Sequence, residues 1–177
     1  MPASGIAAAR ALLSGTEEQR RAFVRERFER LGFAQQGLAH YLHGRLQPGL
    51  GGPALELGHM LAVAVYLAFE STPGLRLRPL SEDRVAAVEA ALSADEELRQ
   101  HDPVDALDSE DIVAIEQPAL VAFVNEHIGL TLEQNAGSID VDHVALVFRA
   151  ILVEILALSQ AVVPPPGHSA SDGEALA

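Results

Sequence analysis

Residues 53–69 read PALELGHMLAVAVYLAF, and this stretch decides the fold class. Pro53 suits the first position of a helix, where the backbone N–H that proline lacks is not needed. The apolar residues that follow cover nearly the whole circumference of the predicted helix, so other elements must enclose it on all sides. Residues 141–163 repeat this pattern behind Asp140, a residue type that caps helix N-termini. The two stretches predict a pair of central helices with the other helices packed around them.

The rest of the chain also carries helix signals, and strand signals are nearly absent. Thr16 and Gln19 have the spacing of a capping box, which predicts a helix over residues 17–31. Further helices are predicted over residues 33–45 and 118–132. Another is predicted to begin at Glu82, with a break near Ser93, and one more to follow a cap at Asp108 or Ser109. We therefore expect an all-α fold. It is a single bundle of about six to eight helices within residues 1–163, followed by a flexible Pro/Gly/Ser tail over residues 164–177.

Two nearly all-apolar helices can do more than fill a core. Burying both completely is demanding in a chain of 177 residues. One of them could therefore also form a homodimer interface or line a pocket for an apolar ligand. For the pocket we expect a cavity lined by side chains such as Met60, Val63, Leu67, Leu146 and Leu152.

Charge is distributed unevenly along the chain. Residues 1–50 hold seven arginines and four acids, a balance of +3, whereas residues 51–177 hold five arginines and 21 acids, a balance of −16. Together these give the formal net charge of −13. Such asymmetry indicates surfaces and partners rather than a fold.

The acids are most concentrated between residues 95 and 116, where Arg99 is the one cation in the segment. Their spacing differs from that of a calcium-binding EF-hand loop, which needs acids at alternate positions and a central glycine. Two interpretations stay open: a solvated loop with helix-capping acids, or a docking surface for a basic protein, where opposite charge speeds encounter. The residues predicted to bind this partner are Asp95, Glu96, Glu97, Asp102, Asp105, Asp108, Glu110, Asp111 and Glu116.

The arginine-rich helix over residues 17–31 is less basic than its arginine content suggests. Glu17 and Arg21, and likewise Glu26 and Arg30, have the i,i+4 spacing and order that favour ion pairs. Because these pairs neutralise much of the helix and the rest of the chain would repel phosphate, we expect no binding to nucleic acid.

Arg20 and Arg27 stand apart from these pairs. They fall on the same predicted helical stripe as Val24 and Leu31, seven residues from each other. From there they could extend along the edge of the core, or reach the acidic segment of this chain or of a second copy.

Missing residue types exclude several kinds of chemistry. The chain has no cysteine, and all of its 12 cationic Lys or Arg residues are arginine. Without cysteine there is no thiol nucleophile, disulfide or zinc–thiolate site. Without lysine there is neither a Schiff-base lysine nor the lysine of a nucleotide-binding P-loop.

The N-terminal sequence and the apolar runs indicate where the protein works. Residues 1–15 lack the basic start and long apolar core of a signal peptide. The longest apolar run, residues 60–69, is far shorter than the roughly 20 residues that span a bilayer. We therefore expect a soluble, cytoplasmic protein that does not bind membranes.

A carboxylate and a histidine at i,i+3 spacing occur twice. Glu56 and His59 would lie on one face of the first central helix, the arrangement of ligands in di-iron bundles, and Asp140 and His143 repeat the spacing. The further carboxylates that such a site needs could come from Glu26, Glu29 and Glu126. However, both acids of the pairs stand at helix starts, where the helix dipole or an N-cap explains them without a metal. We keep Glu56 and His59 as alternative metal ligands and otherwise expect no cofactor.

Residues 39–44 read AHYLHG, which resembles the phospho-accepting segment of histidine phosphotransfer domains, Ala-His-x-Leu-Lys-Gly. The resemblance implies a helical bundle in which His40 accepts the phosphoryl group. The chain departs from the pattern at His43, which stands in place of the lysine, and Pro48 would end a helix that those domains continue. The alternative is a helix with two surface histidines.

These observations favour a protein that is not an enzyme. We expect a non-catalytic protein–protein interaction module, such as an adaptor, a regulator or an inhibitor of the immunity type, with an acidic surface for a basic partner. The first alternative is a bundle that holds an apolar ligand or a di-iron-type site in its core. The second alternative is a domain similar to histidine phosphotransfer proteins.

Overall fold

A computed structural model of the protein describes residues 3–11, 16–47, 49–101 and 109–163, which confirm the predicted all-α bundle. The first four helices are α1 (Ala3–Ala11), α2 (Glu17–Ala34), α3 (Gln36–Arg45) and α4 (Gly52–Glu70). The other four helices of the described residues are α5 (Glu82–His101), α6 (Ser109–Glu116), α7 (Pro118–Gln134) and α8 (Val141–Ala161). The predicted tail over residues 164–177 lies outside the described residues.

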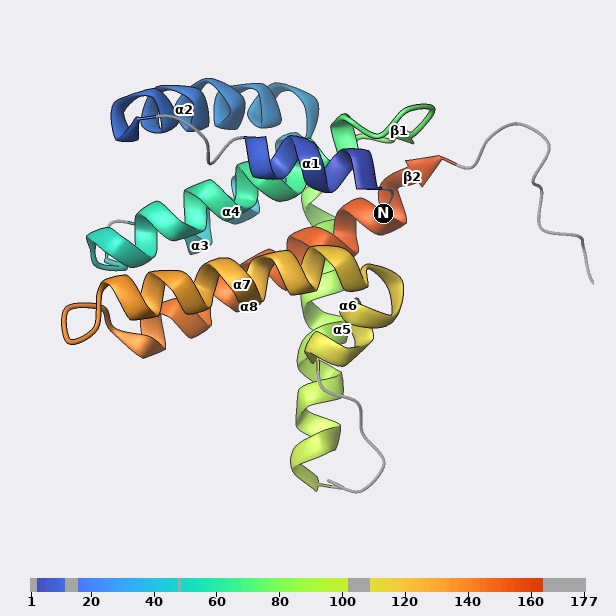
Figure 1. Ribbon diagram of the computed structural model, residues 1–177. Coiled ribbons are helices and arrows are strands. Elements are labelled where there is room, and N and C mark those ends of the chain that lie inside the picture. Colours follow the sequence, from blue (N-terminus) through green and yellow to red (C-terminus); the bar gives the residue numbers. More distant parts are fainter. Residues whose placement is uncertain (1–2, 12–15, 48, 102–108, 164–177) are drawn as a thin grey trace, which may run out of the picture.

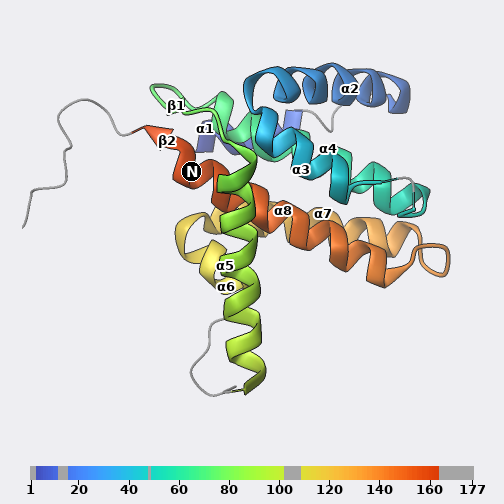
Figure 2. The ribbon, with the colours of Figure 1, turned by 180° about the vertical axis from the view of Figure 1, so that it is seen from behind.

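The two apolar helices form the centre of the bundle, as predicted. Every residue from 61 to 69 in α4 and from 151 to 158 in α8 is buried. Helices α1 and α2 cover α4, and α3 packs against α2, α5 and α8, while α7 runs along α8 and α5 crosses it (Figures 1 and 2). The C-terminal half of α5 extends beyond the other helices in both views. The core therefore lies at the crossing of α4 and α8, and α5 carries its later residues away from it.

The helices differ from those predicted in several places. Helix α1 was not predicted, and α2 continues to Ala34, so that α3 begins only at Gln36. The predicted break near Ser93 is wrong, because α5 is continuous through it. The Ser93 hydroxyl donates to the Glu89 carbonyl at 3.0 Å and accepts from Arg149 of α8 at 2.8 Å. Its hydroxyl is therefore occupied inside the fold instead of capping a new helix.

A short antiparallel pair of strands ends the last helix earlier than predicted. Strand β1 (Arg76–Leu77) pairs with β2 (Val162–Val163) in the register Arg76 to Val163 and Leu77 to Val162. The Arg78 amide also donates to the Ala161 carbonyl at 2.9 Å. These bonds hold residues 162 and 163 extended, so α8 does not continue to residue 163.

The start of α3 packs closely against the segment before α5. The side-chain nitrogen of Gln35 donates to the Arg78 carbonyl at 3.3 Å. Its side-chain oxygen accepts from the backbone N–H of Leu80 at 2.9 Å. The Gly37 amide donates to the Leu80 carbonyl at 3.1 Å. Gln35 is almost fully buried, so its side chain fastens α3 to this segment where no regular secondary structure does.

Helix α4 is long and apolar enough to cross a bilayer by length and composition, with 19 residues and a mean hydropathy of 1.4. About two thirds of its apolar stretch is nevertheless buried inside the bundle. This burial is what the core helix of a soluble protein shows.

Candidate functional site

The predicted acidic surface comes from the end of α5 and from α6, and the structure describes part of it. Of the nine predicted partner-binding residues, Asp102, Asp105 and Asp108 lie outside the described residues, as does the side chain of Asp95. Of the predicted partner-binding residues whose side chains are described, Glu97, Asp111 and Glu116 are exposed to solvent. These three we call the acidic surface.

Two of the predicted acids are used inside the fold. Glu96 is partly buried and makes a charge-assisted hydrogen bond with Arg149, which also bonds to Ser93. Arg149 is the arginine that interrupts the apolar sequence of α8, and this contact explains how it is accommodated. Glu110 accepts a hydrogen bond from the Asn125 side chain of α7 at 2.6 Å. Glu96 and Glu110 therefore fasten α5 and α6 to their neighbours.

An exposed apolar side chain lies beside the two acids of the acidic surface that belong to α6. Ile115 of α6 has 71% of its surface exposed, next to Glu116 and four residues after Asp111. Positions four apart lie on one face of a helix. Ile115 was not predicted as a surface residue, because an isoleucine in a short helix is more often buried.

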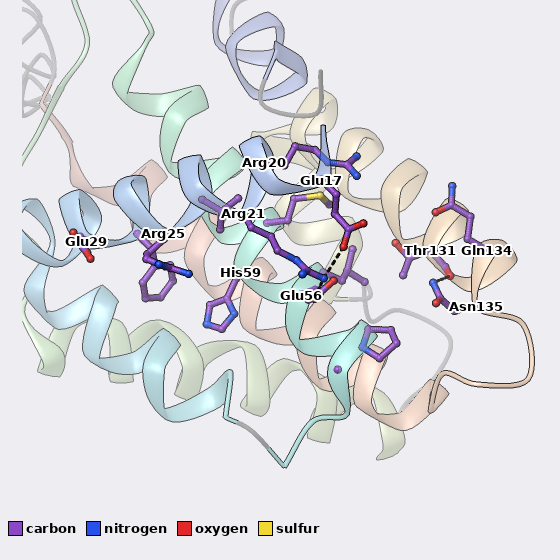
Figure 3. A pocket seen from close by; sticks show the side chains of 16 residues that line it. Glu17, Arg20, Arg21, Arg25, Glu29, Glu56, His59, Thr131, Gln134 and Asn135 are labelled. Atoms are coloured by element: carbon purple, nitrogen blue, oxygen red, sulfur yellow. Dashed lines mark hydrogen bonds and ion pairs between the residues drawn. The ribbon is translucent and has the colours of Figure 1, made fainter. Parts of the chain in front are cut away.

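A groove runs between α2, α4 and the end of α7, with a volume of about 760 Å³ (Figure 3). Its apolar lining comes from Val24 and Phe28 of α2 and from Leu57 and Met60 of α4. Met60 is the one residue of the predicted ligand cavity that lines this groove. Val63, Leu67 and Leu152 are buried in the core, and Leu146 is exposed on α8.

Charged side chains line the rest of the groove (Figure 3). The Arg21 guanidinium contacts the Glu17 carboxylate at 2.6 Å and the Glu56 carboxylate at 2.8 Å. The first of these is the predicted i,i+4 pair. Within the described part of the chain, neither Arg20 nor Arg25 has a carboxylate partner.

The second predicted pair of α2 does not form. The Arg30 guanidinium contacts the Glu70 carboxylate of α4 at 2.8 Å instead of Glu26. Arg27 lies over the Phe23 ring at 4.9 Å from its centroid, and its Nε is buried without a hydrogen-bond partner. At Arg30, a contact with α4 thus replaces the predicted pair along α2.

Glu56 and His59, the alternative metal ligands, lie near each other on α4, but each has another contact. Glu56 binds Arg21, and the His59 ring meets the Phe28 ring edge-on at 5.2 Å between centroids. Burial lowers the pKa of the His59 imidazole below its ordinary value. Among the described side chains, no group of three or more His, Cys, Asp or Glu residues could hold a metal ion. For the second pair, Asp140 caps α8 by accepting from the Asp142 amide at 2.9 Å.

His40, the residue that the resemblance to histidine phosphotransfer domains points to, is exposed on α3. Helix α3 ends at Arg45, before Pro48, so the helix is not continued as it is in those domains. His43 is exposed on the same helix.

A buried acid in the middle of α8 was not predicted from the sequence. Glu154 has no exposed surface, and neither of its carboxyl oxygens has a hydrogen-bond partner. Burial raises the pKa of this carboxyl well above its ordinary value. A carboxyl group without a hydrogen-bond partner is unusual in an apolar core, because its polar atoms give up water without a replacement.

No protein-family model, curated protein or solved structure matches the chain.

Proposed function

We propose that the protein is a non-catalytic interaction module of the cytoplasm that binds a basic protein through the acidic surface. The observation that carries the proposal is the exposure of Ile115 beside Glu116 and Asp111. Adaptors, regulators and inhibitors of basic proteins are the functions that such a surface would serve.

Charge and apolar contact play different parts at this surface. Residues 51–177 carry a balance of −16, so a basic partner is attracted from a distance and encounters the protein faster. Charge at the rim adds little affinity by itself, because water and salt screen it. Burying an exposed isoleucine removes apolar surface from water and can supply the affinity that the charges do not.

The position of the surface suits docking. The later part of α5 extends beyond the other helices, and α6 packs on α7 and α8 near it (Figure 1). A partner can therefore reach Glu97, Asp111, Ile115 and Glu116 without displacing any core residue. Substitutions of these exposed side chains leave the core residues unchanged, and circular dichroism of each variant checks that the fold is kept.

The first test neutralises the acidic surface. We expect that the tagged protein recovers a basic protein from the cytoplasm of its source cells. We expect the variant Glu97→Gln/Asp111→Asn/Glu116→Gln to recover about tenfold less of this partner at low salt. The matched control, Glu18→Gln/Glu26→Gln/Glu133→Gln, changes the charge equally at exposed acids of α2 and α7, and we expect it to recover the partner like the unmodified protein.

The apolar contact is tested separately. Ile115→Ser should lower recovery of the same partner at all salt concentrations, because the lost contact is apolar. Phe33→Ser removes a side chain that is 85% exposed on α2 and should have no effect. Equal recovery by the acid-neutralised variant and its control would show that the acidic surface is not the docking site.

A further inference from the structure

We propose that the groove between α2, α4 and α7 binds a small amphipathic anion, namely a carboxylate attached to an apolar chain. The groove is separate from the acidic surface, which lies on α5 and α6. Binding in the groove is therefore a second function and does not depend on the docking proposed above. Its apolar floor, its free guanidinium groups and the direction of two helices support this assignment.

The floor leaves apolar surface in contact with water. Val24, Phe28 and Met60 are only partly buried, although they face the groove from two packed helices. An apolar chain laid over these side chains would remove that surface from water. The groove volume of about 760 Å³ lies within the range of roughly 300–1,000 Å³ found for small-ligand sites.

The guanidinium groups supply the recognition of an anion. Arg21 is occupied by Glu17 and Glu56, whereas Arg20 and Arg25 have no carboxylate partner in the described parts of the chain. The remaining acid that lines the groove is Glu29. An arginine presents a planar pair of N–H donors that matches a carboxylate, and such charge-assisted hydrogen bonds are among the stronger ones.

Two helices also begin at the same end of the groove. Glu17 in the first turn of α2 and Gly52 and Pro53 in the first turn of α4 line it, and both helices run in the same direction from there (Figure 1). The N-cap residue of α4 is Gly51, which has no side chain to cap the first-turn N–H groups. The partial positive charge of the α4 N-terminus adds to that of the arginines.

The net charge of the chain favours a small ligand over an acidic protein. At a net charge of −13, the protein as a whole repels an acidic macromolecule. A ligand with a single carboxylate meets little of this repulsion at 0.15 M salt, where charges are screened within about 8 Å. It can then contact Arg20 or Arg25 directly while its apolar chain covers the floor.

A fluorescent reporter can locate the site, because the chain contains no tryptophan. In the variant Phe28→Trp the single indole would lie in the groove. We expect decanoate to shift its emission in a saturable titration with one site per chain. In the control variant Phe33→Trp the indole would stand on the same helix at a position that is 85% exposed and outside the groove, so its emission should not change.

The role of the arginines is tested by calorimetric titration with decanoate. We expect Arg20→Gln/Arg25→Gln to raise the Kd at least tenfold. The control Arg76→Gln/Arg84→Gln loses two exposed arginines away from the groove and should keep the original Kd. Decan-1-ol has the same chain without the carboxylate, and its binding should be weaker and insensitive to the loss of Arg20 and Arg25.

A variant of the floor gives an independent measurement. Val24→Asn leaves the arginines in place and makes part of the floor polar, so it should also weaken decanoate binding. Circular dichroism of each variant confirms that the fold is kept. Absence of saturable decanoate binding by the unmodified protein, or an equal Kd for the two arginine variants, would overturn the proposal.

Discussion

Replacing Glu154 with leucine raises the free energy of unfolding by about 2 kcal/mol or more at neutral pH, because a buried polar group without a hydrogen bond costs about 1–3 kcal/mol. The carboxyl group is fully buried in α8 and has no partner for either oxygen. Leucine has a similar volume and removes this cost without opening a cavity. Urea denaturation followed by circular dichroism measures the gain.

The same carboxyl makes stability depend on pH. Burial raises the pKa of Glu154 in the folded protein above the value of about 4.3 expected for the unfolded chain. Between these two pKa values the folded protein keeps a proton that the unfolded chain has lost. The protein is therefore most stable below the pKa of the unfolded chain. Its free energy of unfolding falls as pH rises from there towards the pKa of the folded protein, by up to about 1.4 kcal/mol per pH unit for this group.

Two control variants separate this effect from the general charge of the protein. Glu154→Gln removes the titration but keeps a buried polar group, so it should flatten the pH dependence without the full gain in stability. Glu116→Gln removes an exposed acid and should leave the slope between pH 5 and pH 8 unchanged. If Glu154→Leu is less stable than the unmodified protein, the carboxyl has a partner in the core, and the alternative of a bundle that holds a ligand there gains support.

The central helices could be predicted from the sequence because a helix that is apolar nearly all the way round must be enclosed by other elements. Residues 61–69 and 151–158 are all buried in the structure, as this pattern requires. The start of α2 was predictable for a local reason, since Thr16 and Gln19 make the capping box that their spacing indicates. Local capping patterns and nearly all-apolar helices can thus be recognised without knowledge of the neighbouring elements.

Features that depend on a distant partner could not be predicted. The pattern at Ser93 resembles a helix start, but Arg149, 56 residues away, binds its hydroxyl in the middle of α5. The sequence likewise does not indicate that Glu96 forms an ion pair with an arginine, or that the buried carboxyl oxygens of Glu154 have no hydrogen-bond partner. The groove is likewise a product of how α2 lies on α4, and no spacing along either helix indicates it.

Gly37→Ala is the substitution for which we expect the largest loss of stability. A Cβ atom at Gly37 would lie 2.4 Å from the Ser81 carbonyl carbon, 2.5 Å from the Glu82 nitrogen and 2.6 Å from the Leu80 oxygen. These are backbone atoms, which cannot move aside as the end of a side chain can. Relief of the clash would separate α3 from the segment before α5 and strain the hydrogen bond from Gly37 to Leu80. We expect a loss of about 3 kcal/mol in the free energy of unfolding.

The matched control is Gly44→Ala on the same helix. Nothing lies within 4 Å of a Cβ atom at Gly44, so alanine there only lowers the entropy of the unfolded chain. We expect it to raise stability by about 0.5 kcal/mol, the lower end of the usual difference between alanine and glycine in a helix. Thermal unfolding of both variants should shift the midpoint in opposite directions. Similar small shifts for the two would mean that the segment before α5 yields to α3, and the tight junction at Gly37 would not be what holds these elements together.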